Sequence, residues 1–155
     1  MAVDSHEATT GPAPDYDEIV RVIQLYVDGF NQSDINKFKV AFHEDARITF
    51  TNADGELSSE LLSDLFEEWS APWEGVEGDE FVLRVLAVTQ AGDVASVVLE
   101  MYTPNDLSNA WVDIHSLLRI DGVWKDMNKT ATHSSRAAWA GAASSQAGSS
   151  VGDAS

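Results

Sequence analysis

The sequence has 155 residues, with 9 basic and 26 acidic side chains and a formal net charge of −17 at pH 7. Such a charge repels phosphate backbones and anionic lipid, and no apolar run is long enough to cross a membrane, so neither nucleic acid nor a membrane is expected as a partner. The length indicates one domain, and the lack of cysteine excludes disulfides and thiolate chemistry and favours a cytoplasmic location.

The chain divides into one folded domain and two end segments of low complexity. Residues 1–14 carry glycine, proline and threonine without periodicity, and residues 137–155 are mostly small side chains. Neither segment has enough apolar surface to order itself, so we predict a disordered leader and a disordered tail. The domain between them, residues 15–136, contains all of the regular hydrophobic patterns.

Three helices are predicted from apolar residues at helical spacing. The apolar stripe of the first helix contains Tyr26, whose hydroxyl can therefore reach the interior. A core tyrosine with one satisfied hydrogen bond is the simpler explanation of this residue. Trp69 ends the apolar stripe of the third helix. The predicted helices cover residues 15–31, 35–42 and 58–69.

Strand patterns account for the rest of the domain. A first strand is predicted before the third helix, and four long strands follow that helix. Helices gathered on one side of a curved antiparallel sheet make an α+β fold. The predicted strands cover residues 47–51, 81–89, 94–103 and the two arms of a hairpin over 111–133.

The turn of this hairpin, the Asp-Gly pair at positions 121–122, decides which residues face one another. A two-residue turn pairs residue 120 with residue 123 and brings Asp126 and Asn128 alongside His115. A three-residue loop with a bulge pairs residue 119 with residue 123 and brings Met127 and Lys129 to that face instead. One residue of slip exchanges the whole set, and the spacing alone is compatible with both registers.

Several phrases along the chain carry a family resemblance. They are LYVDGFNQSD, FKVAFHEDARITF, DGELSSELLSDLFEEW and DIHSLLRIDGVWKDMNK. The chain resembles the nuclear transport factor 2-like (SnoaL-like) superfamily over residues 15–133, and within it the "putative lumazine-binding" subgroup. That resemblance implies a cone-shaped, strongly curved sheet with three helices packed over it, an internal ligand pocket and a homodimer. It names no reaction, because the superfamily includes isomerases, dehydratases, cyclases and non-catalytic scaffolds.

The resemblance also favours one register of the hairpin. In related pocket proteins the face that carries the Asp113 position points into the cone, so we prefer the bulged loop. The pocket wall is then expected to contain Trp111, Asp113, His115 and Leu117, facing Met127, Lys129, Ala131 and His133. Tyr26 matches a tyrosine that donates a hydrogen bond to a developing oxyanion in the ketosteroid-isomerase branch.

Two catalytic patterns of the superfamily do not transfer whole. The position of the general-base aspartate of the isomerase branch corresponds to Phe50 and Thr51 in this chain, so the resemblance does not imply steroid-type isomerisation. The histidine that the dehydratase branch places after the third helix is absent, since this chain has Trp69 and Trp73 in that region.

A local group of polar residues is the remaining candidate site. Asp113 and His115 lie two positions apart and project from one strand face, so the carboxylate can orient the imidazole for use as a general base. Lys129 could neutralise Asp113 or hold an anionic group of a substrate. A structural ion pair beside a wall histidine is an equally good explanation.

The predicted function is a small-molecule pocket protein, and more specifically a cofactor-independent lyase, isomerase or cyclase that uses proton transfer on a small, largely apolar substrate. The alternative is a non-catalytic ligand-binding or scaffold module. Asp113, His115 and Tyr26 are the predicted catalytic residues. The predicted substrate contacts are Lys129, Trp111, Met127 and Trp69. No metal site is expected, because the four histidines are dispersed and no His-rich spacing occurs.

Overall fold

The structure, a computed structural model, describes residues 13–72 and 79–132. The segments predicted to be disordered therefore lie outside the described residues, except for Ala13 and Pro14, and Ala13 belongs to the hydrophobic core. The elements in chain order are α1 (Tyr16–Asn31), α2 (Ile35–Ala41), β1 (Phe42–Thr51), β2 (Leu57–Leu61), the 3₁₀ helix η1 (Leu62–Leu65), α3 (Phe66–Trp69), β3 (Val82–Ala91), β4 (Val94–Thr103), β5 (Asp106–Ile120) and β6 (Val123–Thr130).

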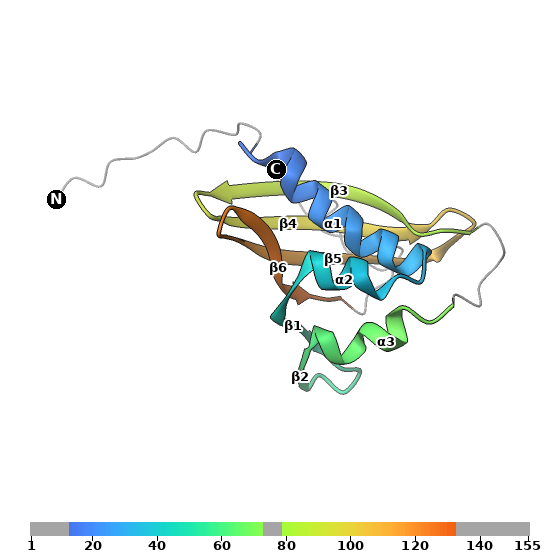
Figure 1. Cartoon of the computed structure of the whole chain (residues 1–155). Helices are drawn as coiled ribbons and strands as arrows, with labels where there is room; N and C mark the ends of the chain where they lie inside the picture. The colour runs from blue at the N-terminus through green and yellow to red at the C-terminus, as the bar shows by residue number, and fades with distance from the viewer. Residues whose placement is uncertain (1–12, 73–78, 133–155) are drawn as a thin grey trace, which may run out of the picture.

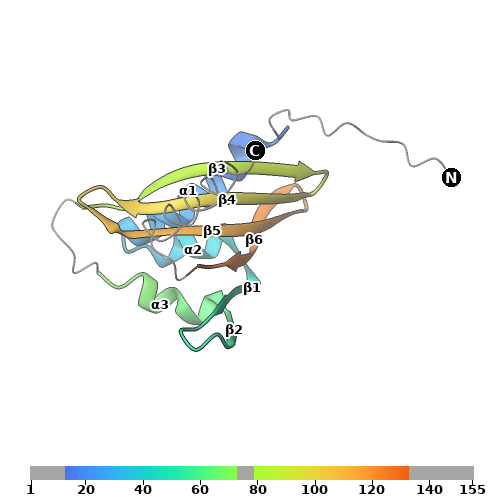
Figure 2. The same ribbon diagram turned by 180° about the vertical axis from the view of Figure 1, so that it is seen from behind.

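One six-stranded sheet organises the described part of the chain, with the strand order β2-β1-β6-β5-β4-β3. Its neighbouring strands are antiparallel except for β1 and β6, which run parallel, so the sheet is mixed rather than wholly antiparallel. Helices α1 and α2 lie across one face of the sheet, and α3 lies beside the β1–β2 hairpin (Figure 1). Seen from behind, the long strands β3, β4 and β5 lie in front of α1 and α2 (Figure 2). This is the predicted α+β class.

Helix α1 packs its apolar side against the core because its apolar residues recur at helical spacing. Its buried stripe contains Ile19, Ile23 and Tyr26, none of which is exposed to solvent. Gly29 lets α2 approach closely, since a Cβ at this position would lie 2.5 Å from the Phe38 ring. The stripe therefore fixes Tyr26 against the inner face of the sheet.

The N-terminus of α1 is held by a cluster of polar contacts. Arg119 of β5 places one guanidinium nitrogen 2.6 Å from Asp15 and another 2.6 Å from Asp93. Asp15 also accepts hydrogen bonds from the Trp124 indole at 3.2 Å and from Gln90 at 3.0 Å. These contacts join the start of the helix to both arms of the β5–β6 hairpin and to β3, which restricts rotation of α1 over the sheet.

The predicted third helix, residues 58–69, is wrong in its first half. Leu57–Leu61 forms β2, and only η1 and α3 after it are helical. The strand is fixed by β1, because the Arg47 guanidinium donates both to the Ser59 hydroxyl at 3.0 Å and to the Ser59 carbonyl at 2.8 Å. Pairing with the neighbouring strand β1 overrides the local helical pattern here.

The preferred turn of the β5–β6 hairpin is also wrong. Ile120 pairs with Val123, so the turn has two residues, and both Asp121 (φ 50°) and Gly122 (φ 80°) are left-handed, as such a turn requires. A bulge occurs further along β6, where the pairing shifts between Ser116 and Leu117 of β5. The bulge changes the face of the strand, so both sets of residues weighed from the sequence reach the interior in part.

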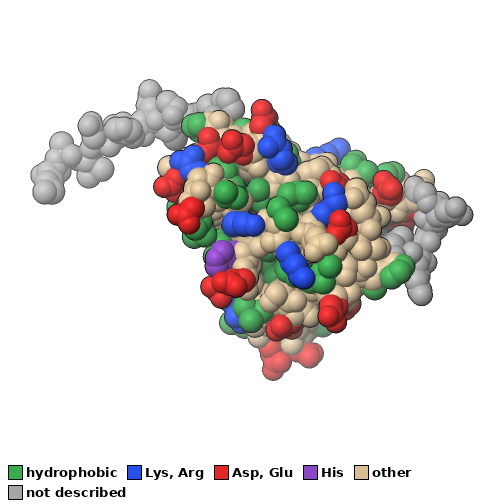
Figure 3. All heavy atoms as spheres, in the orientation of Figure 1, with side chains coloured by type: hydrophobic (Ala, Val, Ile, Leu, Met, Phe, Trp, Pro, Cys, Tyr) green, Lys and Arg blue, Asp and Glu red, His purple; other side chains and the backbone are tan. Residues whose placement is uncertain are grey.

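The surface of the helix-bearing face carries charges of both signs. Acidic side chains gather toward the edges of this face and basic ones lie nearer its middle (Figure 3). In the described part, no helix has both the length and the apolar character needed to span a bilayer.

Candidate functional site

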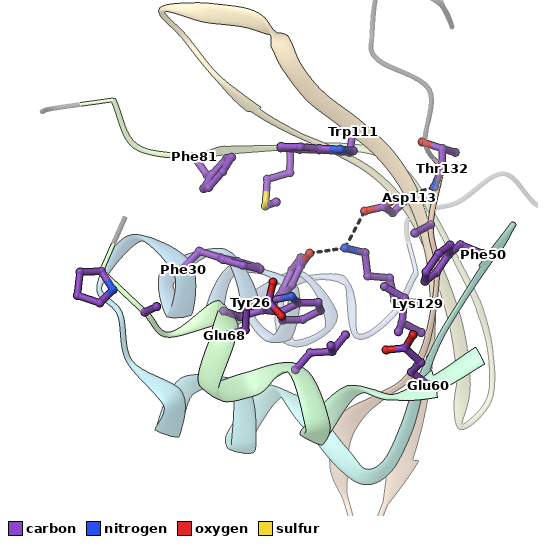
Figure 4. Close-up of a pocket in the computed structure, with 17 residues that line it drawn as sticks. Tyr26, Phe30, Phe50, Glu60, Glu68, Phe81, Trp111, Asp113, Lys129 and Thr132 are labelled. Carbon is purple, nitrogen blue, oxygen red and sulfur yellow. Dashed lines mark hydrogen bonds and ion pairs between the residues drawn. The ribbon is translucent and has the colours of Figure 1, made fainter. Parts of the chain in front are cut away.

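A pocket of about 540 Å³ opens between the sheet and the helices. Its walls are mainly apolar and include aromatic side chains from α1, β1, α3, the residue before β3 and β5 (Figure 4). The volume lies in the range that suits a small organic ligand. The wall rings, besides Tyr26, are Phe30, Phe50, Trp69, Phe81 and Trp111.

Three polar residues lie together at the inner end of this pocket. The Lys129 ammonium donates a hydrogen bond to the Tyr26 phenol oxygen over 2.7 Å and lies 3.2 Å from the Asp113 Oδ2 atom. Lys129 comes from β6, Asp113 from β5 and Tyr26 from α1, so three elements converge at one point (Figure 4). Asp113 Oδ1 accepts a hydrogen bond from the Thr132 backbone N–H at 3.2 Å.

The ionic state of this group follows from its burial. Burial raises the pKa of the Tyr26 phenol above its ordinary value of 10.0, against the opposing effect of the Lys129 charge. Burial pulls the pKa of Lys129 down, but the neighbouring Tyr26 oxygen and Asp113 carboxylate outweigh it, so that pKa is raised. At neutral pH the site therefore holds a neutral phenol and a charged ammonium.

The neutral Tyr26 phenol can therefore donate a hydrogen bond to a ligand. Its oxygen accepts the Lys129 hydrogen bond, and none of the other described residues accepts the phenol proton. Asp113 Oδ2 faces the same Lys129 ammonium at 3.2 Å, which is its one partner among the described residues, and can accept a further hydrogen bond. The group thus offers a donor and an acceptor within one small volume.

His115 does not join this group. Its Nδ1 atom lies 2.5 Å from Oδ2 of Asp126, both residues are fully buried, and His115 is not a lining residue of the pocket. The two-residue turn brings Asp126 to this position, so the carboxylate partner of His115 is Asp126 and not Asp113. Burial raises the pKa of Asp126, and the nearby His115 opposes that rise. His115 Nε2 and Asp126 Oδ1 have no hydrogen-bond partner in the described structure.

The predicted substrate contacts separate into two groups. Trp69, Trp111 and Lys129 line the pocket, whereas Met127 lies at the bulge of β6 and does not. Lys129 Nζ also lies 5.3 Å from the centre of the Trp69 ring, so the wall stabilises a cation through the face of an aromatic ring. Ala131 lines the pocket as expected, and His133 and Trp73 lie outside the described residues.

Two carboxylates of the pocket were not predicted from the sequence. Glu60 of β2 and Glu68 of α3 both line it and are exposed to solvent. Their part in the site depends on the β1–β2 hairpin and on the placement of α3, which the helical pattern of residues 58–69 misrepresents. The contact between His115 and Asp126 was not expected from the preferred turn. The local sequence signal for it was the alternative two-residue turn.

One further group of potential metal ligands occurs away from the pocket. His43, Glu44 and Asp45 of β1 place their ligand atoms within 4.8 Å of one another, and no other such group is found in residues 13–72 and 79–132. Glu44 and Asp45 are exposed, and His43 Nδ1 already accepts a hydrogen bond from the Asp45 backbone N–H at 3.1 Å. The group is explained as a local contact at the surface of β1.

A curved sheet, helices on its inner face and a pocket between them are features of the NTF2-like class. Solved structures of that class match this chain. An NTF2-like protein of unknown function from Shewanella baltica OS155 has 21% identity and a TM-score of 0.66, over 78% of this chain and 95% of that chain. A second one, from Methylobacillus flagellatus KT, has 24% identity and a TM-score of 0.62, over 78% and 93%. A ketosteroid isomerase-like protein from Erwinia carotovora atroseptica SCRI1043 has 16% identity and a TM-score of 0.53, over 76% and 95%.

The sequence match is more specific than these structural likenesses. A family model described as "putative lumazine-binding" matches residues 14–131, which is most of the chain. The chain therefore belongs to this family, and the NTF2-like fold predicted from the sequence is confirmed. The comparison with curated proteins gave no match.

Proposed function

We propose that this protein is a cofactor-independent enzyme of the lyase, isomerase or cyclase type, which transfers a proton on a small, largely apolar substrate bearing a carbonyl-type oxygen. The observation that carries the proposal is the Tyr26–Lys129–Asp113 group at the inner end of an aromatic pocket. Fold and family support a ligand-binding pocket protein. The catalytic step is the part proposed here.

The substrate oxygen is assigned to Tyr26 and Lys129. A neutral phenol and an ammonium together can donate two hydrogen bonds to an oxygen that gains negative charge. Tyr26 and Lys129 are buried, so these donors act more strongly than they would in solvent. Ring side chains on several sides suit a flat substrate body.

The proton acceptor is assigned to Asp113. Its Oδ2 atom takes a proton from the carbon next to the carbonyl, and the electron pair of that C–H bond moves to form an enolate, whose oxygen is held by Tyr26 and Lys129. Return of the proton to another carbon of the enolate gives the isomer and restores the carboxylate. Asp113 suits this role because it lines the pocket. The general-base role predicted for His115 stays a prediction, and its position outside the lining favours Asp113.

An exchange experiment tests the catalytic part. The protein is incubated with 2-tetralone in D₂O, and the loss of the C–H signals next to the carbonyl is followed by NMR. We expect exchange above the buffer rate, reduced about 100-fold or more in Tyr26→Phe and in Asp113→Asn. Tyr16→Phe and Asp17→Asn, on the exposed part of α1, are the matched controls and should exchange like the wild type. Exchange that is equal in all four variants would contradict the proposal.

The alternative function, a non-catalytic binding module, has its own outcome. The family description names lumazine, a flat bicyclic molecule with ring carbonyls, and lumazine is therefore a second probe. If calorimetry shows that lumazine or 2-tetralone binds to the pocket while exchange stays at the buffer rate, the binding module is the better description. Loss of binding in Tyr26→Phe would still assign the ligand to this pocket.

Two further properties belong to the proposal. A homodimer through the outer face of the sheet is supported by exposed apolar residues there, among them Ile114 and Leu118 of β5. Sedimentation at micromolar concentration tests the homodimer, and a clean monomer would contradict it. The second property, a cytoplasmic location, is supported by the lack of cysteine.

A further inference from the structure

The charge of Lys129 is already balanced within the protein. Its ammonium is ion-paired with Asp113 at 3.2 Å and hydrogen-bonded to the Tyr26 oxygen at 2.7 Å. We propose that the pocket selects its ligand by charge, accepting neutral or cationic flat molecules and rejecting anions with the same ring body. This inference rests on the proposed ligand pocket and names the class of molecule that it takes.

The lining residues carry an excess of negative charge. Among the described residues, the lining contains the carboxylate side chains of Asp113, Glu60 and Glu68 and the ammonium of Lys129, with a formal net charge of −2. Glu60 and Glu68 come from β2 and α3, and both carboxylates are drawn at the pocket in Figure 4. A carboxylate or phosphate on the ligand would approach two uncompensated negative charges and one cation that already has a partner.

The aromatic walls add to the same preference. The faces of aromatic rings are negative and attract cations. This protein shows that effect with its own cation, because Lys129 Nζ lies 5.3 Å from the centre of the Trp69 ring. An anion in place of a cation would face the same rings with the opposite sign of interaction.

A buried acceptor at the inner end completes the argument. Asp113 is 1% exposed and lines the pocket, and its Oδ2 atom has one partner among the described residues, the Lys129 ammonium at 3.2 Å. An ionised carboxylate oxygen can accept more than one hydrogen bond, so this atom can also accept one from a ligand. A neutral or cationic ligand can donate a hydrogen bond to this atom, whereas a carboxylate ligand has only acceptors.

Three probes with one ring body test the selection. They are 2-naphthalenemethanol (neutral), 2-naphthylmethylamine (cationic) and 2-naphthoate (anionic), titrated into the full-length protein by calorimetry at pH 7 and about 0.15 M salt, where long-range charge effects are screened. We expect the naphthoate to bind at least about tenfold more weakly than the other two. Naphthoate that binds as tightly as the alcohol, or more tightly, would overturn the inference.

Charge-removing variants assign the selection to the pocket. In the double variant Glu60→Gln/Glu68→Gln, the ratio of the dissociation constants of naphthoate and the alcohol should fall by about threefold or more. The matched control, Glu44→Gln/Glu67→Gln, removes two exposed carboxylates that do not line this pocket and should leave the difference unchanged. If the control narrows the difference equally, the overall charge of −17 and not the pocket makes the selection, and the inference is wrong.

The outcomes separate this inference from the proposed function. Absence of binding for all three probes, together with absence of binding for 2-tetralone, would contradict the ligand pocket itself. Binding of all three with equal affinity would leave the pocket in place and contradict only the charge selection. Either result can be read without knowledge of the natural substrate.

Discussion

The Lys129 ammonium lies 2.7 Å from the Tyr26 phenol oxygen, although the two residues are 103 positions apart in the chain. Tyr26 is buried by the apolar stripe of α1, and Lys129 reaches it because the β6 bulge turns this residue inward. Helix packing and strand irregularity are therefore both needed to build the site, and each can be tested separately.

The pH dependence of stability should report the Tyr26–Lys129 pair. Both groups have a pKa above the ordinary value in the folded state, 10.0 for tyrosine and 10.5 for lysine in the unfolded chain. Their contribution to stability is thus complete below about pH 10 and is lost as the pH rises through the folded-state values. In urea unfolding from pH 8 to 11, Tyr26→Phe should lose stability less steeply than the wild type. Tyr16→Phe is the control, and a slope unchanged in Tyr26→Phe would contradict the assignment.

Removal of the buried ammonium should be costly. Lys129→Met leaves Asp113 as an unpaired charge at 1% exposure, so we expect a loss of about 3–5 kcal/mol in the free energy of unfolding. The double variant Asp113→Asn/Lys129→Met removes both charges and should recover part of that loss. Lys37→Met, at a position outside the pocket, should change stability by less than about 0.5 kcal/mol. If the double variant is less stable than Lys129→Met alone, the unpaired charge of Asp113 is not the cause of the loss of stability.

The difference in stability between the wild type and the nearly isosteric variant Asp126→Asn should depend on pH. Because burial raises the pKa of Asp126, its contribution to stability is complete below the ordinary value of 3.8 and is lost as the pH rises through the folded-state value. Asp126→Asn has no such titration, so the wild type should become less stable relative to this variant as the pH rises above about 4. Guanidinium unfolding at several pH values measures the difference. If the wild type instead became more stable relative to Asp126→Asn as the pH rises, the prediction would be contradicted. That result would mean that His115 stabilises the ionised Asp126 carboxylate by more than burial destabilises it.

The close approach of α1 and α2 should not tolerate a methyl group. In Gly29→Ala the new Cβ would lie 2.5 Å from the Phe38 ring, which is fully buried and has little room to move. Overpacking of this kind costs about 1–3 kcal/mol, and the better helix propensity of alanine returns about 1 kcal/mol at most. Thermal unfolding should show a lower midpoint for Gly29→Ala, while Arg21→Ala on the exposed side of α1 should show little change. An unchanged midpoint for Gly29→Ala would mean that α2 shifts freely.

The parts of the fold that follow from local patterns were predictable. The stripe containing Tyr26 gave α1 and its buried face, and β4 begins and ends at the predicted residues, 94–103. The strand β2 was not predictable, because residues 58–61 carry a helical pattern and become a strand only by pairing with β1.

The site was predictable only in part for a similar reason. Alternation along β5 puts Asp113 and His115 on one face, and family resemblance indicates that this face is inward. The partner of each residue depends on the turn together with the bulge in β6, and no local pattern marks a bulge. Asp126 therefore pairs with His115, and Lys129 with Asp113, in a combination that neither simple register contains.

The most direct test of the central claim is the ¹³C signal of a carbonyl in the pocket. 2-Tetralone labelled at its carbonyl carbon is added to saturating protein, and the shift of the bound form is compared between the wild type, Tyr26→Phe and Tyr16→Phe. If Tyr26 and Lys129 polarise the substrate oxygen, the bound signal lies downfield of its value in water, and Tyr26→Phe moves it back while Tyr16→Phe does not. An upfield shift in the wild type, or a shift that Tyr26→Phe leaves unchanged, would contradict the account.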